Sequence, residues 1–262
     1  MEEATKLKQV RKGATTPVPL PVSYWLYFKR AILERPEVRE QFASAPLGPD
    51  QFRALLKKEA NPAKWGPSFC RTGRGRSDST VRRMTTDMLA VVWRYYEALL
   101  HPDSPIYVAE SKRAGGLGLF ARRTSTVAVE SAFAPAHLFG ICFGVTEEQF
   151  SELESVGYPS LYWHEPSILY GPLSLINHKC GSLLCFSFSR KIDPRQRQAA
   201  GKAVTLEEFA GLSAVYTLAI QEGCRIKEHQ EITIDYFNTG GDDDDKKVTF
   251  FGAPCRCRTC SK

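Results

Sequence analysis

The sequence predicts an α+β fold, in which an N-terminal helical region precedes a larger region of short strands. Apolar residues recur at spacings of three and four between Ser79 and Leu100, which is the pattern of one buried helix face. Beyond residue 104, short β-like runs follow one another, and glycine, proline or polar turns separate most of them. No regular helix alternates with these runs, which argues against a doubly wound fold.

Composition sets the broad class of protein. The chain has 262 residues, 43% of them hydrophobic and 24% charged, which is ordinary for a globular protein and argues against disorder. The net charge of +6 is mild, so it is compatible with an acidic or nucleic-acid partner without requiring one. No run of 18 apolar residues predicts a membrane span, and the N-terminus lacks the apolar core of a signal peptide. We therefore expect an intracellular protein whose eight cysteines are reduced.

The helical region covers residues 1–104 and begins with a basic, then proline-rich stretch of about 20 residues that we interpret as a flexible lead-in. Ser23 is placed to cap the first helix, and Pro36 is expected to break or restart it. Three helices are predicted in this region: Ser23–Glu34, Asp50–Ala60 and Ser79–Leu100.

The strand-rich domain covers residues 105–240. Seven runs are predicted as strands: Ile106–Ala109, Leu117–Ala121, Leu138–Phe143, Ser160–Trp163, Leu183–Phe188, Val215–Ile220 and Glu231–Tyr236. Capping boxes that begin at Thr146 and Thr205 predict two short helices among them. The last region, residues 241–262, holds the acidic run Asp242–Asp245, interpreted as a solvated loop, and a cysteine-rich end.

Three closely spaced cysteines mark that end, in the pattern C-x-C-x2-C: Cys255, Cys257 and Cys260. Thiolates suit zinc, which takes four ligands in a tetrahedron, so these residues supply three corners of a zinc site. The fourth ligand must come from elsewhere in the fold. Spacing alone does not choose among the other cysteines: Cys70, Cys142, Cys180, Cys185 and Cys224.

Three further elements are ambiguous when each is taken alone. The glycines of AGGLGLFA, residues 114–121, allow close approach to a ligand or simply form a β-turn. Asn177 and His178 follow an apolar pair, and they fit buried hydrogen-bonding groups, a metal site or a catalytic pair. In EITIDY, alternation places Ile232 and Ile234 on one face of a strand that ends at a tyrosine.

The order of the motifs is more informative than any one of them. GLGLFA, NHKC, EITIDY and CRCRTC, in this order, resemble the SET-domain protein lysine methyltransferases with a C-terminal zinc-binding post-SET segment. The resemblance runs from about Ile106 to the end of the chain. FFGAPCRCRTC and YPSLYWHEPSILYGPLSLINHKC look most like the suppressor-of-variegation enzymes that methylate the histone H4 tail, which also carry an N-terminal helical region.

The resemblance implies a SET domain with a knot-like crossing over residues 105–240 and a post-SET zinc segment after it. It implies S-adenosylmethionine as cofactor, bound by Leu117, Gly118, Ser160, Leu161, Tyr162, Asn177 and His178. Tyr236 matches the catalytic tyrosine, and Ile234 falls in the lysine channel. One zinc is expected on Cys180, Cys255, Cys257 and Cys260.

The activity that the resemblance implies is methyl transfer to a lysine, with a histone tail as the expected substrate and histone H4 favoured. Nucleosomes would present that tail, and a weak contact with nucleic acid would fit the mild positive charge of the chain. No membrane partner is expected. The expected location is the nucleus and the chromosome. Isoleucine at position 234 cannot hold a water by hydrogen bonding, which favours di- or trimethylation.

The sequence departs from the family pattern at three places, one of which is a longer chain than expected between Arg190 and Glu208. Gly181-Ser182-Leu183 follows the asparagine motif instead of a Pro-Asn pair, and His229-Gln230 replaces Gly-Glu before the last strand. The two motif changes support one alternative, a catalytically weak chromatin-binding module on the same fold. A second alternative is a zinc-stapled nucleic-acid-binding protein, in which the basic loop 71–76 would contact phosphates.

Overall fold

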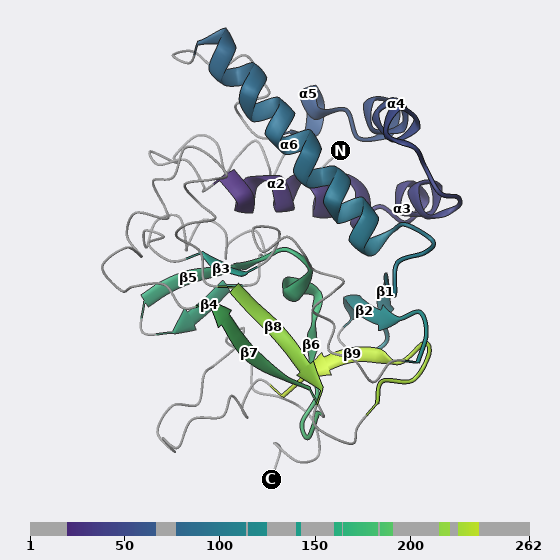
Figure 1. Ribbon diagram of the computed structural model, residues 1–262, viewed down its shortest axis with the longest axis vertical. Coiled ribbons are helices and arrows are strands. Elements are labelled where there is room, and N and C mark those ends of the chain that lie inside the picture. Colours follow the sequence, from purple (N-terminus) through teal and green to yellow (C-terminus); the bar gives the residue numbers. More distant parts are fainter. Residues whose placement is uncertain are drawn as a thin grey trace.

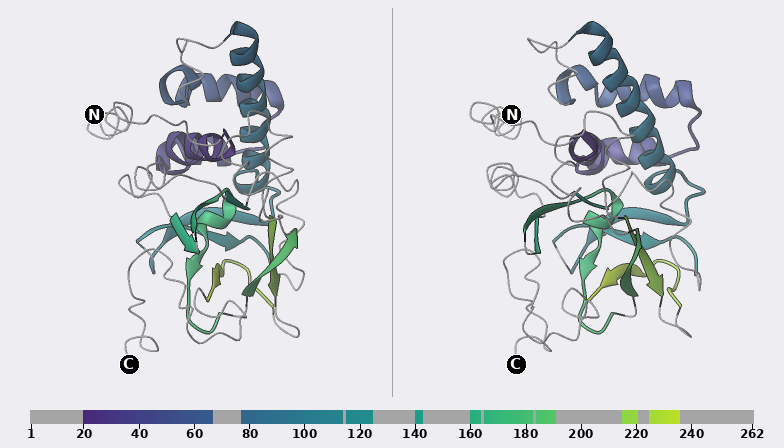
Figure 2. Two further views of the ribbon diagram at one scale, coloured as in Figure 1. Left: turned by 90° about the vertical axis from the view of Figure 1, so that its left-hand side faces the viewer. Right: turned by 60° about the vertical axis from the view of Figure 1, so that its left-hand side comes forward.

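The computed structural model describes residues 20–66, 77–113, 115–124, 140–142, 160–163, 165–182, 184–190, 215–220 and 225–235. Several predicted features lie outside these ranges: the lead-in, the basic loop 71–76, the helices expected after Thr146 and Thr205, and the run Asp242–Asp245. Helices occupy one half of the molecule and strands the other in all three views (Figures 1 and 2). Within the described ranges, none of the helices has the length and apolar character needed to cross a bilayer.

The longest helix, α6 (Asp78–Leu99), confirms the strongest helical pattern of the sequence. The Ser77 hydroxyl accepts a hydrogen bond from the Thr80 amide and so caps the first turn of the helix. The carboxylate of Asp78 in the same turn interacts favourably with the positive end of the helix dipole. Its buried residues recur at the predicted spacing: Met84, Met88, Val91, Val92, Tyr95, Tyr96 and Leu99. This stripe faces α2 and the sheet below it (Figure 1).

The first predicted helix exists, but its cap was predicted wrongly. α2 (Leu20–Phe28) continues into a π-helical turn, η1 (Lys29–Leu33), so Ser23 lies inside the helix. A new helix starts at Pro36, and proline also opens the next two, because proline's fixed φ suits the first helical position, where no amide donor is needed. These three are α3 (Pro36–Ala43), α4 (Pro49–Glu59) and α5 (Pro62–Trp65).

The strands form three small sheets. The first has the order β1-β2-β9-β6, the second β3-β5-β4, and the third pairs β7 with β8. Their bounds are β1 (Ile106–Ser111), β2 (Gly116–Ala121), β3 (Gly140–Cys142), β4 (Ser160–Trp163), β5 (Glu165–Tyr170), β6 (Asn177–His178), β7 (Leu184–Arg190), β8 (Val215–Ile220) and β9 (Glu231–Ile234). A 3-10 turn, η5 (Pro172–Leu175), leads into β6. Each of the seven predicted runs overlaps a strand, whereas β5 and β6 were not predicted.

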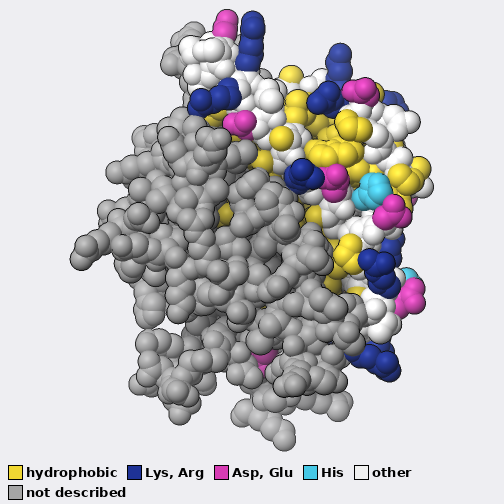
Figure 3. Space-filling model, in the orientation of Figure 1, with side chains coloured by type: hydrophobic (Ala, Val, Ile, Leu, Met, Phe, Trp, Pro, Cys, Tyr) yellow, Lys and Arg dark blue, Asp and Glu magenta, His cyan; other side chains and the backbone are white. Residues whose placement is uncertain are grey.

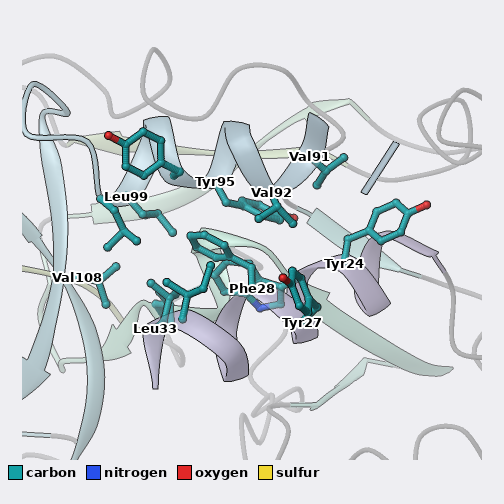
Figure 4. Close-up of a cluster of buried hydrophobic side chains, with 14 of the residues drawn as sticks. Tyr24, Tyr27, Phe28, Leu33, Val91, Val92, Tyr95, Leu99 and Val108 are labelled. Carbon is teal, nitrogen blue, oxygen red and sulfur yellow. The ribbon is translucent and has the colours of Figure 1, made fainter. Parts of the chain in front are cut away.

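One hydrophobic core joins the helices to the first sheet. The ring centroids of Trp25 and Phe28 lie 4.9 and 5.3 Å from that of Tyr95, so α2 and α6 interlock through aromatic contacts. Leu33 and Val108 lie at the end of this cluster, where the helices meet β1 (Figure 4). The same cluster continues through Leu119, Ile232 and Ile234. The helical region therefore packs directly on the strands that carry the motifs.

A part-buried hydrogen bond ties α2 to the turn that leads into Asn177. The Trp25 indole nitrogen donates to the Ser174 hydroxyl at 2.9 Å, and that hydroxyl donates to the Gly171 carbonyl at 2.7 Å. Trp25 is fully buried. If the Ser174 hydroxyl were removed, the indole N–H would therefore be left without a hydrogen-bond acceptor where water cannot replace it.

Ser174→Ala should therefore lower the free energy of unfolding by about 1–3 kcal/mol, the cost of an unsatisfied buried donor. Urea denaturation measures this, with Ser44→Ala as the control, because the Ser44 hydroxyl donates to the Gln41 carbonyl three residues away on the exposed surface. A double-mutant cycle with Trp25→Phe isolates the interaction between the two side chains. If the changes in unfolding free energy of the two single variants simply add up in the double variant, the hydrogen bond between Trp25 and Ser174 does not stabilise the fold.

Candidate functional site

The candidate site forms where two short chain segments run side by side. β6 lies parallel to β9, with Asn177 opposite Thr233 and His178 opposite Ile234. The amide of Lys179 donates to the Ile234 carbonyl at 2.9 Å and extends the pairing by one residue. Because β9 also pairs with β2, this sheet brings GLGLFA, NHKC and EITIDY together, although they are far apart in the sequence. The lower part of Figure 1 shows β2, β9 and β6 side by side.

A tight turn then brings the chain back to β9. The Ser182 amide donates to the Lys179 carbonyl at 3.1 Å, and Gly181 has φ +67°, which a type II turn requires at its third position. The Gly181 amide donates to Asp235 Oδ2 at 2.8 Å, and the Ser182 hydroxyl donates to the Thr233 carbonyl. The departure Gly181-Ser182 from the family pattern thus has a local structural reason.

Asn177 is held by groups that can only accept hydrogen bonds. Its Nδ2 donates to the Leu117 carbonyl at 3.3 Å and to Glu231 Oε1 at 2.8 Å. Gly118 lies under this contact: a Cβ there would stand 2.7 Å from Glu231 Oε1 and 3.0 Å from Asn177 Nδ2. A Cβ at position 118 would therefore require the Glu231 and Asn177 side chains to shift.

His178 links Cys180 to Asp235. Its Nε2 lies 3.0 Å from Cys180 Sγ, and its Nδ1 lies 3.8 Å from Asp235 Oδ1. Burial lowers the pKa of His178, and the charge of Arg113 acts in the same direction, while the Asp235 carboxylate and a backbone hydrogen bond to Ile234 raise it. The lowered pKa favours a neutral imidazole at neutral pH, so His178 adds little positive charge to the site.

The same three side chains could also hold a metal ion, because each has a ligand atom within 4.8 Å of the others. A tetrahedral zinc bound to one nitrogen and one thiolate would set those atoms about 3.5 Å apart. The 3.0 Å between His178 Nε2 and Cys180 Sγ fits a hydrogen bond better. Cys180 is half-buried, and Cys255, Cys257 and Cys260, its predicted partners on zinc, lie outside the described residues.

The second departure from the family pattern also lies in a turn. His229 has φ +58°, a left-handed conformation that glycine adopts more easily than histidine. Its amide donates to the Ala121 carbonyl at 2.8 Å, and its Nδ1 lies 3.2 Å from the Tyr107 hydroxyl. These contacts hold His229 in the left-handed conformation of the turn before β9.

The structure locates the predicted site residues unevenly. It brings Leu117, Gly118, Asn177, His178 and Cys180 together around β9, and it buries Ile234 to 1% exposure in the core. Ser160, Leu161 and Tyr162 lie on β4, of which only the backbone is described, and Tyr236 lies outside the described residues.

Sequence reasoning missed two acidic residues of the site, Glu231 and Asp235. The alternation that places Ile232 and Ile234 on the core side of β9 sets Glu231, Thr233 and Asp235 on the other side. All three of these residues contact the segment 177–182. The same period-two pattern could have identified them.

Comparisons with known proteins add little to this geometry. No family model matches the chain, and no curated protein sequence matches it. A solved structure that it resembles is that of a candidate histone methyltransferase from Plasmodium falciparum, with 20% sequence identity, a TM-score of 0.33, and coverage of 54% of this chain and 97% of that chain. A likeness at this TM-score is too weak to carry a conclusion about activity.

Gly118→Ala should destabilise the protein by about 1–3 kcal/mol, because the new Cβ overlaps Glu231 and Asn177. Gly116→Ala is the matched control on the same strand, since a Cβ there meets nothing within 4 Å. Its effect should stay within about 0.5 kcal/mol. Thermal and urea unfolding measure both variants, and equal effects would show that Gly118 is not sterically constrained.

Proposed function

We propose that this chain is an S-adenosylmethionine-dependent protein lysine methyltransferase of the SET type. One observation carries the proposal: Asn177, Gly118 and Glu231 meet where β6 runs beside β9. Two of these residues belong to the motifs that the resemblance assigns to the cofactor site. The carboxylate of the third gives that meeting point a negative charge.

The polar groups at this point fit a cationic ligand. Glu231 carries a carboxylate on a side chain that is only 14% exposed, and the Asn177 amide oxygen has no donor among the described residues. Both groups accept hydrogen bonds, which suits an ammonium group. Bound there, S-adenosylmethionine would supply a methyl group on a positively charged sulfur.

The chain itself must position a neutral amine in line with that methyl group. Tyr236 follows the last residue of β9 by two positions, so its hydroxyl is our candidate for holding the amine. Apolar surroundings disfavour an ammonium ion and so help to deprotonate the lysine. Ile234 lies in the hydrophobic core on the opposite face of β9, so our proposal of di- or trimethylation rests on the sequence resemblance, in which an isoleucine at this position cannot hold a water beside the amine.

The proposed substrate is a lysine in a basic histone tail on the nucleosome, with histone H4 favoured by the sequence resemblance. This extends the proposal to a nuclear, chromosome-associated enzyme. Basic and acidic side chains are interspersed over the described part of the face in Figure 3, so that part offers no one-signed patch for nucleic acid. This part of the surface therefore gives no support to the nucleic-acid-binding alternative.

Tyr236→Phe should reduce methyl transfer by about 100-fold or more while cofactor affinity stays nearly unchanged, because the lost hydroxyl acts mainly in the transition state. Labelled S-adenosylmethionine with intact nucleosomes measures transfer, and calorimetry measures binding. Tyr24→Phe is the control, since its hydroxyl donates to the Met84 carbonyl within the helical region.

The outcomes separate the alternatives. Cofactor binding without turnover by the wild-type protein would favour the chromatin-binding module, and nucleic-acid binding without cofactor binding would favour the zinc-stapled protein. A wild-type rate in Tyr236→Phe would show that another residue is the catalytic tyrosine.

We also propose that one zinc is bound by Cys180 with Cys255, Cys257 and Cys260. Metal analysis should find about one equivalent of zinc, and Cys257→Ser should lower it severalfold because a tetrahedral site loses a ligand. Asp235→Asn should keep the zinc, since its amide oxygen can still accept from the Gly181 amide. The opposite result, zinc lost with Asp235→Asn and kept with Cys257→Ser, would assign the metal to His178, Cys180 and Asp235 instead.

A further inference from the structure

Glu231 occupies a central place in the site that the resemblance does not assign to it. It opens β9 opposite Phe120 of β2, and its side chain is 14% exposed. Its Oε1 accepts from Asn177 at 2.8 Å, while its Oε2 lies 3.8 Å from the guanidinium of Arg113, which is 52% exposed. This carboxylate is enclosed and is paired with a half-exposed guanidinium, whose charge offsets part of its negative field at the site.

The contacts of Asn177 fix which way its amide faces. The Leu117 carbonyl and the Glu231 carboxylate are both acceptors, so the amide must turn its NH₂ group toward them. Both hydrogens of Nδ2 are then used. The amide oxygen is left as an acceptor that meets no donor among the described residues.

We propose that Glu231 is a positioning residue of the cofactor site, which locks the Asn177 amide and whose charge favours the methyl donor over the demethylated product. The proposal rests on the proposed function. S-adenosylmethionine carries a sulfonium and an ammonium against one carboxylate, a net charge of about +1, whereas S-adenosylhomocysteine lacks the sulfonium charge. A fixed carboxylate distinguishes these two ligands by charge alone.

The two functions of Glu231 separate in two substitutions. Glu231→Gln keeps an oxygen that accepts from Asn177 but removes the charge. Glu231→Ala removes both, so the Asn177 amide loses the anchor that fixes its orientation. Glu110→Gln is the matched control: this residue lies exposed on β1 of the same sheet, and the substitution changes the net charge of the protein by the same amount.

Calorimetric titration of each purified protein with S-adenosylmethionine and with S-adenosylhomocysteine provides a readout that does not depend on turnover. Glu231→Gln should weaken S-adenosylmethionine binding about three- to tenfold and S-adenosylhomocysteine binding less, with the difference shrinking at high salt. Glu231→Ala should weaken both ligands by about tenfold or more, because a hydrogen bond to a charged group and the amide orientation are lost together. Glu110→Gln should bind both ligands as the wild type does.

Each other outcome has a defined meaning. If Glu231→Gln weakens both ligands equally, the charge does not select the donor; if neither variant changes affinity, Glu231 does not position the site. Either result overturns the inference and leaves the proposed methyltransferase in place. Failure of the wild-type protein to bind either ligand would overturn the proposed function as well. Because Glu231→Gln is nearly isosteric, it tests the charge even if Glu231→Ala does not fold.

Discussion

The pairing of two residues, Asn177 and His178, with Thr233 and Ile234 of β9 organises the whole candidate site. Parallel neighbours cannot be joined by a hairpin, so the long intervening chain must leave and return to make this contact. The pairing is short, and side-chain and turn contacts reinforce it. One face of β9 meets the segment 177–182 through Glu231, Thr233 and Asp235, while the opposite face of the strand enters the core through its two isoleucines.

The helical region contributes to the site indirectly, by supporting the chain that enters it. Its core is continuous with the buried face of the first sheet, and Trp25 bonds to the turn that immediately precedes β6. A loss of helix packing would therefore loosen the same turn that sets the position of Asn177. The N-terminal helices and the motif-bearing strands act as one folding unit in this respect, although the sequence divides them clearly by composition.

The sequence predicted those parts of the structure whose signal is local. The period of α6 and the alternation of β9 both depend on neighbours a few residues away, and both were found. Ser23 was predicted to cap the first helix because a serine often stands directly before the apolar run of a helix. The helix instead begins at Leu20, within the proline-rich sequence, so Ser23 lies inside it. β6 was missed because a strand of two residues is too short to show an alternating pattern. These residues form a strand only through their pairing with β9, which is far away in the sequence. The alternating pattern could have placed the polar residues on the outer face of β9. Their role in the site becomes visible only from their contacts with Asn177 and the turn after it.

S-adenosylmethionine is proposed to bind where β2, β9 and β6 lie side by side in the first sheet. Hydrogen exchange read by mass spectrometry, with and without the cofactor, tests this most directly, since it locates binding on the intact chain without a substrate. Binding at this place should slow exchange in peptides covering residues 115–121, 177–182 and 231–235 and leave α6 unchanged. Binding that leaves these three segments unprotected, or that protects the helices instead, would contradict it.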